Sequence, residues 1–238
     1  MAGDKRLSVA LDVPDMNQVK NLVEKLGDSV SYYKVGMELY YSTGREVIAY
    51  LRSLNKDVFL DLKLHDIPNT VAQSLSVLTE LGASMLNVHA SGGLTMMKAA
   101  SQAVTNKAAQ LGIPRPALIA VTVLTSIDAA DWANLRHDMS IKEHVVHLAK
   151  LAQSAGIDGV VASPQEAEAI RAACGKQFVI VTPGVRPQGA AINDQSRIAT
   201  PLEALKKGAH HLVIGRPITA AADPRTAALE IRKEMEAV

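Results

Sequence analysis

The sequence is poor in several kinds of residue, and each scarcity narrows the class of protein. Cys174 is the only cysteine in 238 residues, so no disulfide forms within the chain and a reducing cytoplasm is the natural compartment. The 25 basic and 24 acidic residues give a formal net charge of +1. No run of like charge stands out, so nothing indicates a nucleic-acid groove or a membrane-binding surface.

Long apolar runs and targeting signals are also missing from the sequence. No apolar stretch approaches the roughly 18 residues that a membrane-spanning helix needs. The first residues, Met1 to Arg6, lead directly into an expected strand and show no signal-peptide pattern. We therefore expect a soluble cytoplasmic protein.

Aliphatic residues are abundant, and they are arranged as short apolar runs that alternate with longer helical patterns. Hydrophobic residues make up 48% of the chain and aromatic residues 3%, a mixture that suits helices packed on an aliphatic sheet. The expected strands are Leu7–Leu11, Ser31–Val35, Val58–Lys63, Met85–Val88, Ala117–Val123, Gly159–Ala162, Phe178–Thr182 and His211–Ile214. The expected helices are Met16–Leu26, Gly44–Leu54, Val71–Leu81, Thr95–Leu111, Ile141–Ala155, Pro164–Ala173, Pro201–Lys207 and Pro224–Met235.

Eight successive strand–helix units in a chain of this length predict an α/β fold, the (β/α)₈ TIM barrel. No linker or low-complexity stretch divides the units, so residues 1–238 are expected to form one domain. A doubly wound open sheet is the alternative, but no G-x-G-x-x-G turn follows the first strand. The barrel predicts an active site at the carboxyl ends of the strands.

The segment Asp61-Leu62-Lys63-Leu64-His65-Asp66 places charged groups in a stretch that otherwise resembles a buried strand. Because strand side chains alternate between faces, Asp61 and Lys63 are expected to point together, away from the leucines. Burying such groups is costly unless they are paired or functional. A salt bridge on an exposed edge strand is the structural alternative.

Charged and polar residues lie at the carboxyl ends of successive expected strands, which is where a barrel enzyme carries its active site. A solvated barrel rim would explain one such residue but not charges closing the first three strands in succession. The residues are Asp12, Lys34, Asp61, Lys63, Asp66, His89, Thr125, Arg186, Gly215 and Arg216.

Two loops late in the chain have the character of a phosphate-binding site. The segment Thr182–Gly189 begins a gap that reaches Thr200, which is long for a strand–helix loop and indicates a mobile lid. Gly215-Arg216-Pro217 follows the last strand, where glycine permits close backbone approach and arginine offers a forked donor. The two loops together predict a phosphorylated ligand.

With these motifs, the chain closely resembles the orotidine 5′-phosphate decarboxylase family. The matching segments span nearly the whole chain in family order, and the D-x-K-x-x-D signature combined with both phosphate loops is highly specific. The segments are Ala10–Asp12, Lys34–Gly36, Asp61–Thr70, Asn87–Gly93, Val121–Ser126, Thr182–Gly189 and Ile214–Pro217.

The resemblance implies decarboxylation of orotidine 5′-phosphate to UMP and CO₂ in pyrimidine biosynthesis, by a homodimer that uses no cofactor and no metal. Lys63 would protonate C6 of the pyrimidine, within a charged network of Lys34, Asp61, Lys63 and Asp66. Asp66 and Thr70 would come from the second subunit. The implied substrate-binding residues are Asp12 and Lys34 at the ribose, Thr125, Ile67 and Pro68 near the ring, and Arg186, Gln195, Gly215 and Arg216 at the phosphate.

Three other functions could use the same charged residues. A keto-gulonate-phosphate decarboxylase shares D-x-K-x-x-D but uses Mg²⁺, and its relatives carry a glutamate where this chain has Lys34. A class I aldolase would need Lys63 as a neutral amine, which Asp61 and Asp66 disfavour. A catalytically silent nucleotide-binding barrel is the third, and the retained charges argue against it.

Several histidines and one tryptophan have a structural interpretation. His210-His211 lies at the non-catalytic end of a strand and is not expected to bind zinc. Trp132 is expected to anchor a helix locally. His65 should point with the leucines, and His89 is expected to support the site without a defined role.

Overall fold

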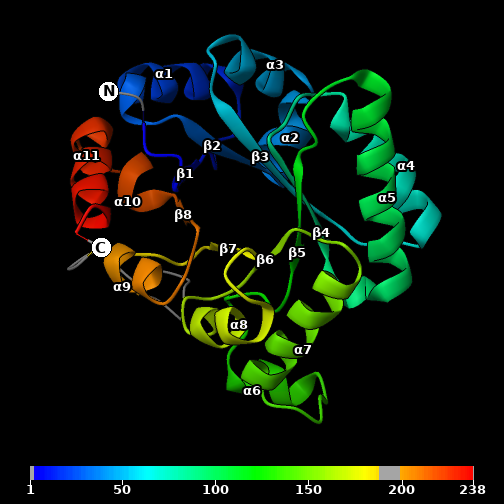
Figure 1. Cartoon of the computed structure of the whole chain (residues 1–238). Coiled ribbons are helices and arrows are strands. Elements are labelled where there is room, and N and C mark those ends of the chain that lie inside the picture. The colour runs from blue at the N-terminus through cyan, green and yellow to red at the C-terminus, as the bar shows by residue number, and fades with distance from the viewer. Residues whose placement is uncertain (1–2, 188–198, 238) are drawn as a thin grey trace.

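The computed structural model describes residues 3–187 and 199–237, which form a closed barrel of eight parallel strands surrounded by helices (Figure 1). The strands follow one another around the barrel in chain order, and β1 closes it by pairing with β8. The TIM-barrel prediction is therefore confirmed. The strands are β1 Leu7–Ala10, β2 Tyr32–Gly36, β3 Asp57–Leu64, β4 Met85–His89, β5 Ala117–Val121, β6 Gly159–Val161, β7 Val179–Thr182 and β8 His211–Ile214.

Helices occupy the connections between the strands and form the outer layer of the barrel (Figure 1). Within the described residues, none of them is both long and apolar enough to cross a membrane. The helices are α1 Met16–Leu26, η1 Gly27–Ser29, α2 Met37–Thr43, α3 Glu46–Ser53, α4 Pro68–Thr79, η2 Ala90–Gly92, α5 Gly93–Leu111, α6 Ala129–Asn134, α7 Ile141–Ser154, α8 Ala167–Cys174, α9 Pro201–Lys206, α10 Arg216–Thr219 and α11 Pro224–Met235.

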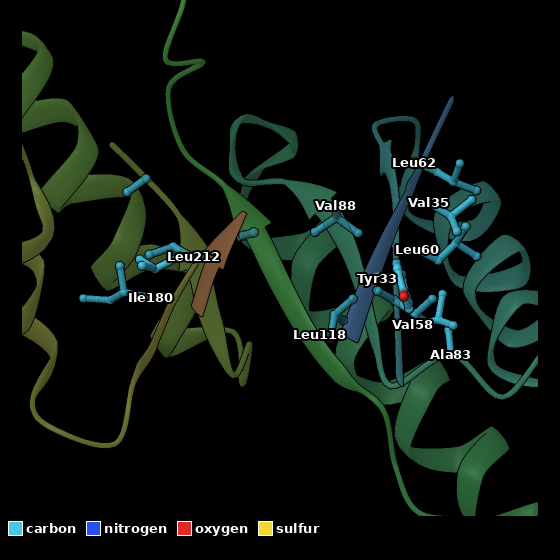
Figure 2. Packing of buried hydrophobic residues seen from close by; sticks show 14 of the residues in the cluster. Tyr33, Val35, Val58, Leu60, Leu62, Ala83, Val88, Leu118, Ile180 and Leu212 are labelled. Carbon is cyan, nitrogen blue, oxygen red and sulfur yellow. The ribbon is translucent and has the colours of Figure 1, made fainter. Parts of the chain in front are cut away.

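Alternation along the strands divides the buried side chains into two layers. Val35, Leu60 and Leu62 belong to the larger cluster, between the strands and the helices, as Figure 2 shows from close by. Burial of one such aliphatic side chain stabilises the fold by roughly 1.5–3 kcal/mol. The smaller cluster fills the barrel interior and contains Ala10, Tyr32, Phe59, Met85, Ile119, Val181 and Val213.

The starts of two helices differ by three residues from the sequence-based expectation, and the other predicted starts lie within two residues of the observed ones. Helix α4 begins at Pro68, three residues before the predicted Val71, because proline fits the first helical turn and needs no N–H partner there. Helix α8 begins at Ala167 and not at Pro164. Ser163 is fully buried, and its carbonyl accepts the Glu166 N–H at 3.1 Å, so the intervening residues form a turn.

Trp132 anchors α6 locally, as expected from the sequence. It is 9% exposed, and its indole N–H donates to the Met139 carbonyl at 2.9 Å. The ring stacks on His137 at a centroid distance of 4.1 Å. Within residues 3–187 and 199–237, no group of three or more His, Cys, Asp or Glu is arranged so that it could hold a metal ion.

His210 makes the stability of the barrel depend on pH. Its Nδ1 lies 2.8 Å from Arg171 Nη2 and 3.2 Å from the Ile180 backbone N–H, so it accepts from two donors as a neutral ring. Burial, followed by the charge of Arg171, lowers the pKa of His210 below its ordinary value of 6.5. A lowered folded-state pKa stabilises the fold above about pH 6.5, and this contribution is lost as the pH falls through the folded-state pKa.

We therefore expect the melting temperature to fall on acidification below about pH 6.5, and to fall less steeply in His210→Leu. At pH 8 this variant should lose roughly 1–3 kcal/mol of unfolding free energy, because the donors of Arg171 and Ile180 lose their acceptor. Denaturant titrations at pH 8.0, 6.5 and 5.5 measure both effects. His147→Leu, at an exposed histidine of α7, is the control and should change stability by less than about 0.5 kcal/mol. If the unfolding free energy of His210→Leu falls on acidification as steeply as that of the wild type, His210 is not the source of this pH dependence.

Candidate active site

A cavity of about 250 Å³ opens at the carboxyl ends of the strands and collects most of the predicted site residues. Its floor is the top of the inner core, with Ala10, Phe59 and Val213 among the lining residues. The predicted residues that line it are Asp12, Lys34, Asp61, Lys63, Thr125, Arg186, Gly215 and Arg216. The barrel therefore brings together side chains from β1, β2, β3, β5, β7 and β8 and the loops that follow them.

Asp61 is the centre of a network in which carboxylates and ammonium groups alternate. Lys63 Nζ lies 2.8 Å from Asp61 Oδ1, and Lys34 Nζ lies 3.6 Å from Asp61 Oδ2. Lys34 Nζ also lies 2.9 Å from Asp12 Oδ1. The order Asp12–Lys34–Asp61–Lys63 gives each buried charge a partner of opposite sign, as the desolvation cost of such groups requires.

The pKa of the Asp61 carboxyl is lowered even though its side chain is buried. Burial acts to raise this pKa, but the charges of Lys34 and Lys63 and the hydrogen bonds from Lys63 and Asn87 outweigh it. Asp61 is therefore ionised in the neutral range. Its negative charge holds an ammonium group directly beside the cavity.

The backbone of β3 departs from regular strand geometry at this network. Phe59 and Leu60 pair with Met85 and Leu86, but Leu64 pairs with Val88, so the register with β4 shifts between Leu60 and Leu64. Lys63 itself has a φ of +54°. Such a conformation costs an L-residue about 1–2 kcal/mol and recurs at functional sites.

Gly36 provides the space that the Lys34 ammonium occupies. A Cβ atom built at Gly36 would lie 2.9 Å from Lys34 Nζ, closer than ordinary contacts allow. Any larger residue at the end of β2 would displace Lys34 from its position between Asp12 and Asp61. Glycine at position 36 is therefore needed sterically to keep the Lys34 ammonium in its place in the site.

Two arginines lie on the β7–β8 side of the cavity. Arg186 is 7% exposed, and its Nη1 donates to the Val185 carbonyl at 3.0 Å. Its backbone N–H donates to the Ala199 carbonyl at 3.0 Å, which fixes the base of the loop. Burial and then the charge of Arg216 lower the pKa of Arg186, as expected for two cations held close together. Such a pair favours a bound anion.

Four predicted residues do not line the cavity, and one cannot be placed. Asp66, Ile67 and Thr70 are exposed and Pro68 is half-buried, all at the start of α4. Asp66 Oδ1 accepts the Ile67 backbone N–H at 2.7 Å. Gln195 and most of the predicted lid lie outside the described residues.

His89 ends β4 beside the network, and its ring centroid lies 5.5 Å from that of His65. Burial, the His65 ring and the Lys63 charge together lower the pKa of His89. An uncharged imidazole is thus favoured next to the Lys63 ammonium.

Asn87 is a site residue to which the sequence-based reasoning assigned no role. It is 2% exposed, its Nδ2 donates to Asp61 Oδ1 at 2.7 Å, and its Oδ1 accepts the Lys63 backbone N–H at 2.8 Å. The available signal was a carboxamide inside the apolar strand Met85–His89, two residues from His89 on the same face.

The architecture and the site define a (β/α)₈ barrel enzyme with a charged network facing a pair of arginines. A family model described as "Orotidine 5'-phosphate decarboxylase / HUMPS family" matches residues 5–231. The chain therefore belongs to the orotidine 5′-phosphate decarboxylase / HUMPS family.

Curated relatives cover the full chain. An orotidine 5′-phosphate decarboxylase of Moorella thermoacetica is 50% identical over 239 residues, covering 100% of this chain and 95% of that protein. One from Nostoc is 47% identical, covering 100% of both chains. The crystal structure of orotidine 5′-phosphate decarboxylase from Lactobacillus acidophilus superposes with a TM-score of 0.85 at 40% identity, covering 98% of this chain and 99% of that one.

Proposed function

We propose that this protein decarboxylates orotidine 5′-phosphate to UMP and CO₂, with Lys63 as the proton donor to C6 of the pyrimidine. The observation that carries the proposal is the Asp12–Lys34–Asp61–Lys63 network at the cavity, with Lys63 Nζ held 2.8 Å from Asp61 Oδ1. The named relatives support the same reaction.

The chemistry requires a fixed positive charge beside C6. Cleavage of the bond between C6 and the carboxylate releases CO₂ and leaves an electron pair in the plane of the ring, where the π system delocalises it poorly. The Lys63 ammonium stabilises this developing carbanion and then transfers a proton from Nζ to C6. Solvent restores the lysine proton after UMP leaves.

Asp61 contributes to the reaction in two ways. It holds the Lys63 ammonium in place, and it repels the substrate carboxylate before CO₂ departs. At 4 Å and an effective dielectric near 20, that repulsion amounts to about 4 kcal/mol. Enzymes lower barriers by ~8–23 kcal/mol, so the repulsion supplements the stabilisation by Lys63 and does not replace it.

The phosphate and the ribose bind on either side of this centre. Arg186, Gly215 and Arg216 take the phosphate, and its binding energy drives closure and desolvation around the ring. Asp12 and Lys34 hold the ribose hydroxyls, and Thr125 contacts the pyrimidine. We also assign Gln195 to the phosphate.

Lys34 favours this function over a Mg²⁺-dependent keto-gulonate-phosphate decarboxylase. Its ammonium lies 2.9 Å from Asp12 Oδ1 and 3.6 Å from Asp61 Oδ2. It therefore already supplies the positive charge between the two carboxylates, and a divalent cation at that place would meet a like charge.

The remaining assigned residues act in a homodimer, in which Asp66 and Thr70 reach the neighbouring subunit's cavity and Ile67 and Pro68 accompany them. Supporting this, Ile67 is 67% exposed at the start of α4, and Tyr41 on α2 is 74% exposed. These side chains are accessible to a second chain.

Subunit exchange tests this arrangement. We expect Lys63→Ala and Asp66→Ala to be nearly inactive alone, and to regain activity when mixed and allowed to exchange. Random exchange makes half of the dimers hybrid, and each hybrid has one intact site of two, so about a quarter of wild-type turnover returns. Lys63→Ala mixed with Asp61→Ala is the matched control and should not recover, because both residues reach a site from the same subunit, so that every site of the hybrid lacks one of them. Failure of the first pair to recover would place Asp66 outside the composite site.

The reaction itself is tested by its product and by the origin of the C6 hydrogen. In D₂O, the wild-type protein should convert orotidine 5′-phosphate to UMP carrying one deuterium at C6, as nuclear magnetic resonance of the product measures. Lys63→Ala should form no labelled UMP. Release of CO₂ at wild-type rate from Lys63→Ala would remove Lys63 from its assigned role.

A further inference from the structure

Asn87 does not line the cavity, but it hydrogen-bonds to Asp61 and Lys63, which do. Met85, Asn87 and His89 occupy alternate positions of β4, on the face that points into the barrel. The side chain is 2% exposed, so its amide has no access to bulk water. A buried carboxamide of this kind must find its partners within the protein.

Both ends of the amide are used, and each end contacts a different part of the network. Nδ2 donates to Asp61 Oδ1 at 2.7 Å, the same oxygen that lies 2.8 Å from Lys63 Nζ. Oδ1 accepts the Lys63 backbone N–H at 2.8 Å. These contacts fix the orientation of the amide. In the reverse orientation, Nδ2 would face the Lys63 N–H, donor against donor, and Oδ1 would face Asp61 Oδ1, acceptor against acceptor.

The contact with the Lys63 backbone replaces a missing contact between strands. Between Leu60 and Leu64 the register of β3 and β4 shifts, so Lys63 has no residue of β4 as its pairing partner. Asn87 Oδ1 serves as the acceptor for this N–H instead. It therefore supports the one stretch of β3 in which a lysine adopts a φ of +54°.

We infer that Asn87 is a positioning residue of the decarboxylation, which holds the Lys63 backbone in its left-handed conformation and orients the Asp61 carboxylate toward Lys63 Nζ. It does not touch the substrate. This inference rests on the proposed function, and it goes further by assigning the geometry of the proton donor to a residue on the neighbouring strand.

Asn87→Leu keeps the branched outline of the side chain, with methyl groups in place of the amide oxygen and nitrogen, and removes both hydrogen bonds. We expect kcat to fall by roughly 100-fold, the loss typical of a reacting group displaced by about 1 Å. The affinity for UMP should change less than about threefold, because the ribose and phosphate contacts lie elsewhere in the cavity. Steady-state kinetics and UMP titration measure this division between kcat and binding.

Asn87→Asp provides a second measurement, the dependence of its activity on pH. This dependence would not change if Asn87 had a purely structural role. The introduced carboxyl still accepts the Lys63 N–H. When it is ionised, however, it places a second negative charge against Asp61, where the native amide donated a hydrogen bond. Its protonated form restores the donor, and two neighbouring carboxylates favour sharing a proton. We expect this variant to become more active relative to wild type as the pH falls from 8 to 6, while Asn87→Leu stays uniformly impaired.

Val88→Ala is the matched control for loss of stability. Val88 is the next residue of β4, is fully buried, and belongs to the core between the strands and the helices. It should lower the melting temperature, by about 2–10 °C, and leave kcat within about twofold. Equal losses of kcat in Val88→Ala and Asn87→Leu would show that instability alone explains the defect.

Failure of the inference is distinguishable from failure of the proposed function. Wild-type protein that does not decarboxylate orotidine 5′-phosphate refutes the function. Active wild type with Asn87→Leu within threefold of its kcat, or with parallel pH profiles for the Leu and Asp variants, refutes the positioning role alone. If Asn87→Leu does not fold, the near-isosteric Asn87→Asp still decides the question through its pH profile.

Discussion

Replacement of Lys63 by alanine should reduce decarboxylation by more than about 10⁴-fold while the barrel stays folded. General acid catalysis by one side chain contributes about 10²–10⁴-fold, and a fixed charge at the developing anion contributes a similar factor. Lys63 supplies both, because its Nζ lies at the cavity and is held 2.8 Å from Asp61 Oδ1. The measurement is the single-turnover rate at saturating enzyme, with UMP binding as the test of an intact cavity.

The unusual backbone of Lys63 provides an internal control for this experiment. At a φ of +54°, glycine avoids the cost that any other residue meets, so Lys63→Gly should be more stable than Lys63→Ala by about 1 kcal/mol. In an ordinary strand, glycine would be the less stable of the two. Both variants should be equally inactive. Wild-type turnover in either of them would show that another group delivers the proton.

Replacement of Asp61 by asparagine should reduce kcat by roughly 100- to 1,000-fold. The variant keeps the shape of the side chain but removes the charge that lies between Lys34 and Lys63. An interaction of about 4 kcal/mol at 4 Å corresponds to a rate factor of this size, since each 1.36 kcal/mol is tenfold. Transient kinetics with orotidine 5′-phosphate measures the loss.

The same variant separates ground-state repulsion from stabilisation by Lys63. If Asp61 repels the substrate carboxylate, Asp61→Asn should bind orotidine 5′-phosphate more tightly than wild type, while the affinity for UMP, which lacks that carboxylate, stays the same. Asp57→Asn is the matched control, because Asp57 begins the same strand and pairs with Lys5 far from the cavity. It should leave turnover unchanged. A kcat of Asp61→Asn within threefold of wild type would contradict the role of the network.

Much of the barrel could be predicted because its signals are local. The apolar run of β8, for example, predicted His211–Ile214 with both boundaries correct, and the helix predicted over Pro224–Met235 coincides with α11. The short helices α2, α6 and α10 were missed, because helices of four to seven residues carry too few turns for a periodic pattern. The start of α8 was misplaced because Ser163, a good helix cap in sequence, is buried and closes a turn.

Eight of the predicted site residues line the cavity, but the geometry between them could not be predicted. Alternation along β3 correctly placed Asp61 and Lys63 on the face that becomes the cavity. The register shift between β3 and β4 and the left-handed backbone of Lys63 depend on how two distant segments pair. Nothing in the residues 61–63 alone encodes them. The role of Asn87 was missed for the same reason, since its partners are on the neighbouring strand.

The most direct test of the account is the loss of pyrimidine ultraviolet absorbance on adding orotidine 5′-phosphate to the wild-type protein in excess EDTA. Rapid and complete conversion to UMP is expected, at a rate that EDTA does not change, because protein side chains alone supply the charge and the proton. No conversion of orotidine 5′-phosphate, followed by Mg²⁺-dependent decarboxylation of a keto-sugar phosphate, would contradict it and assign the protein to the metal-dependent decarboxylases.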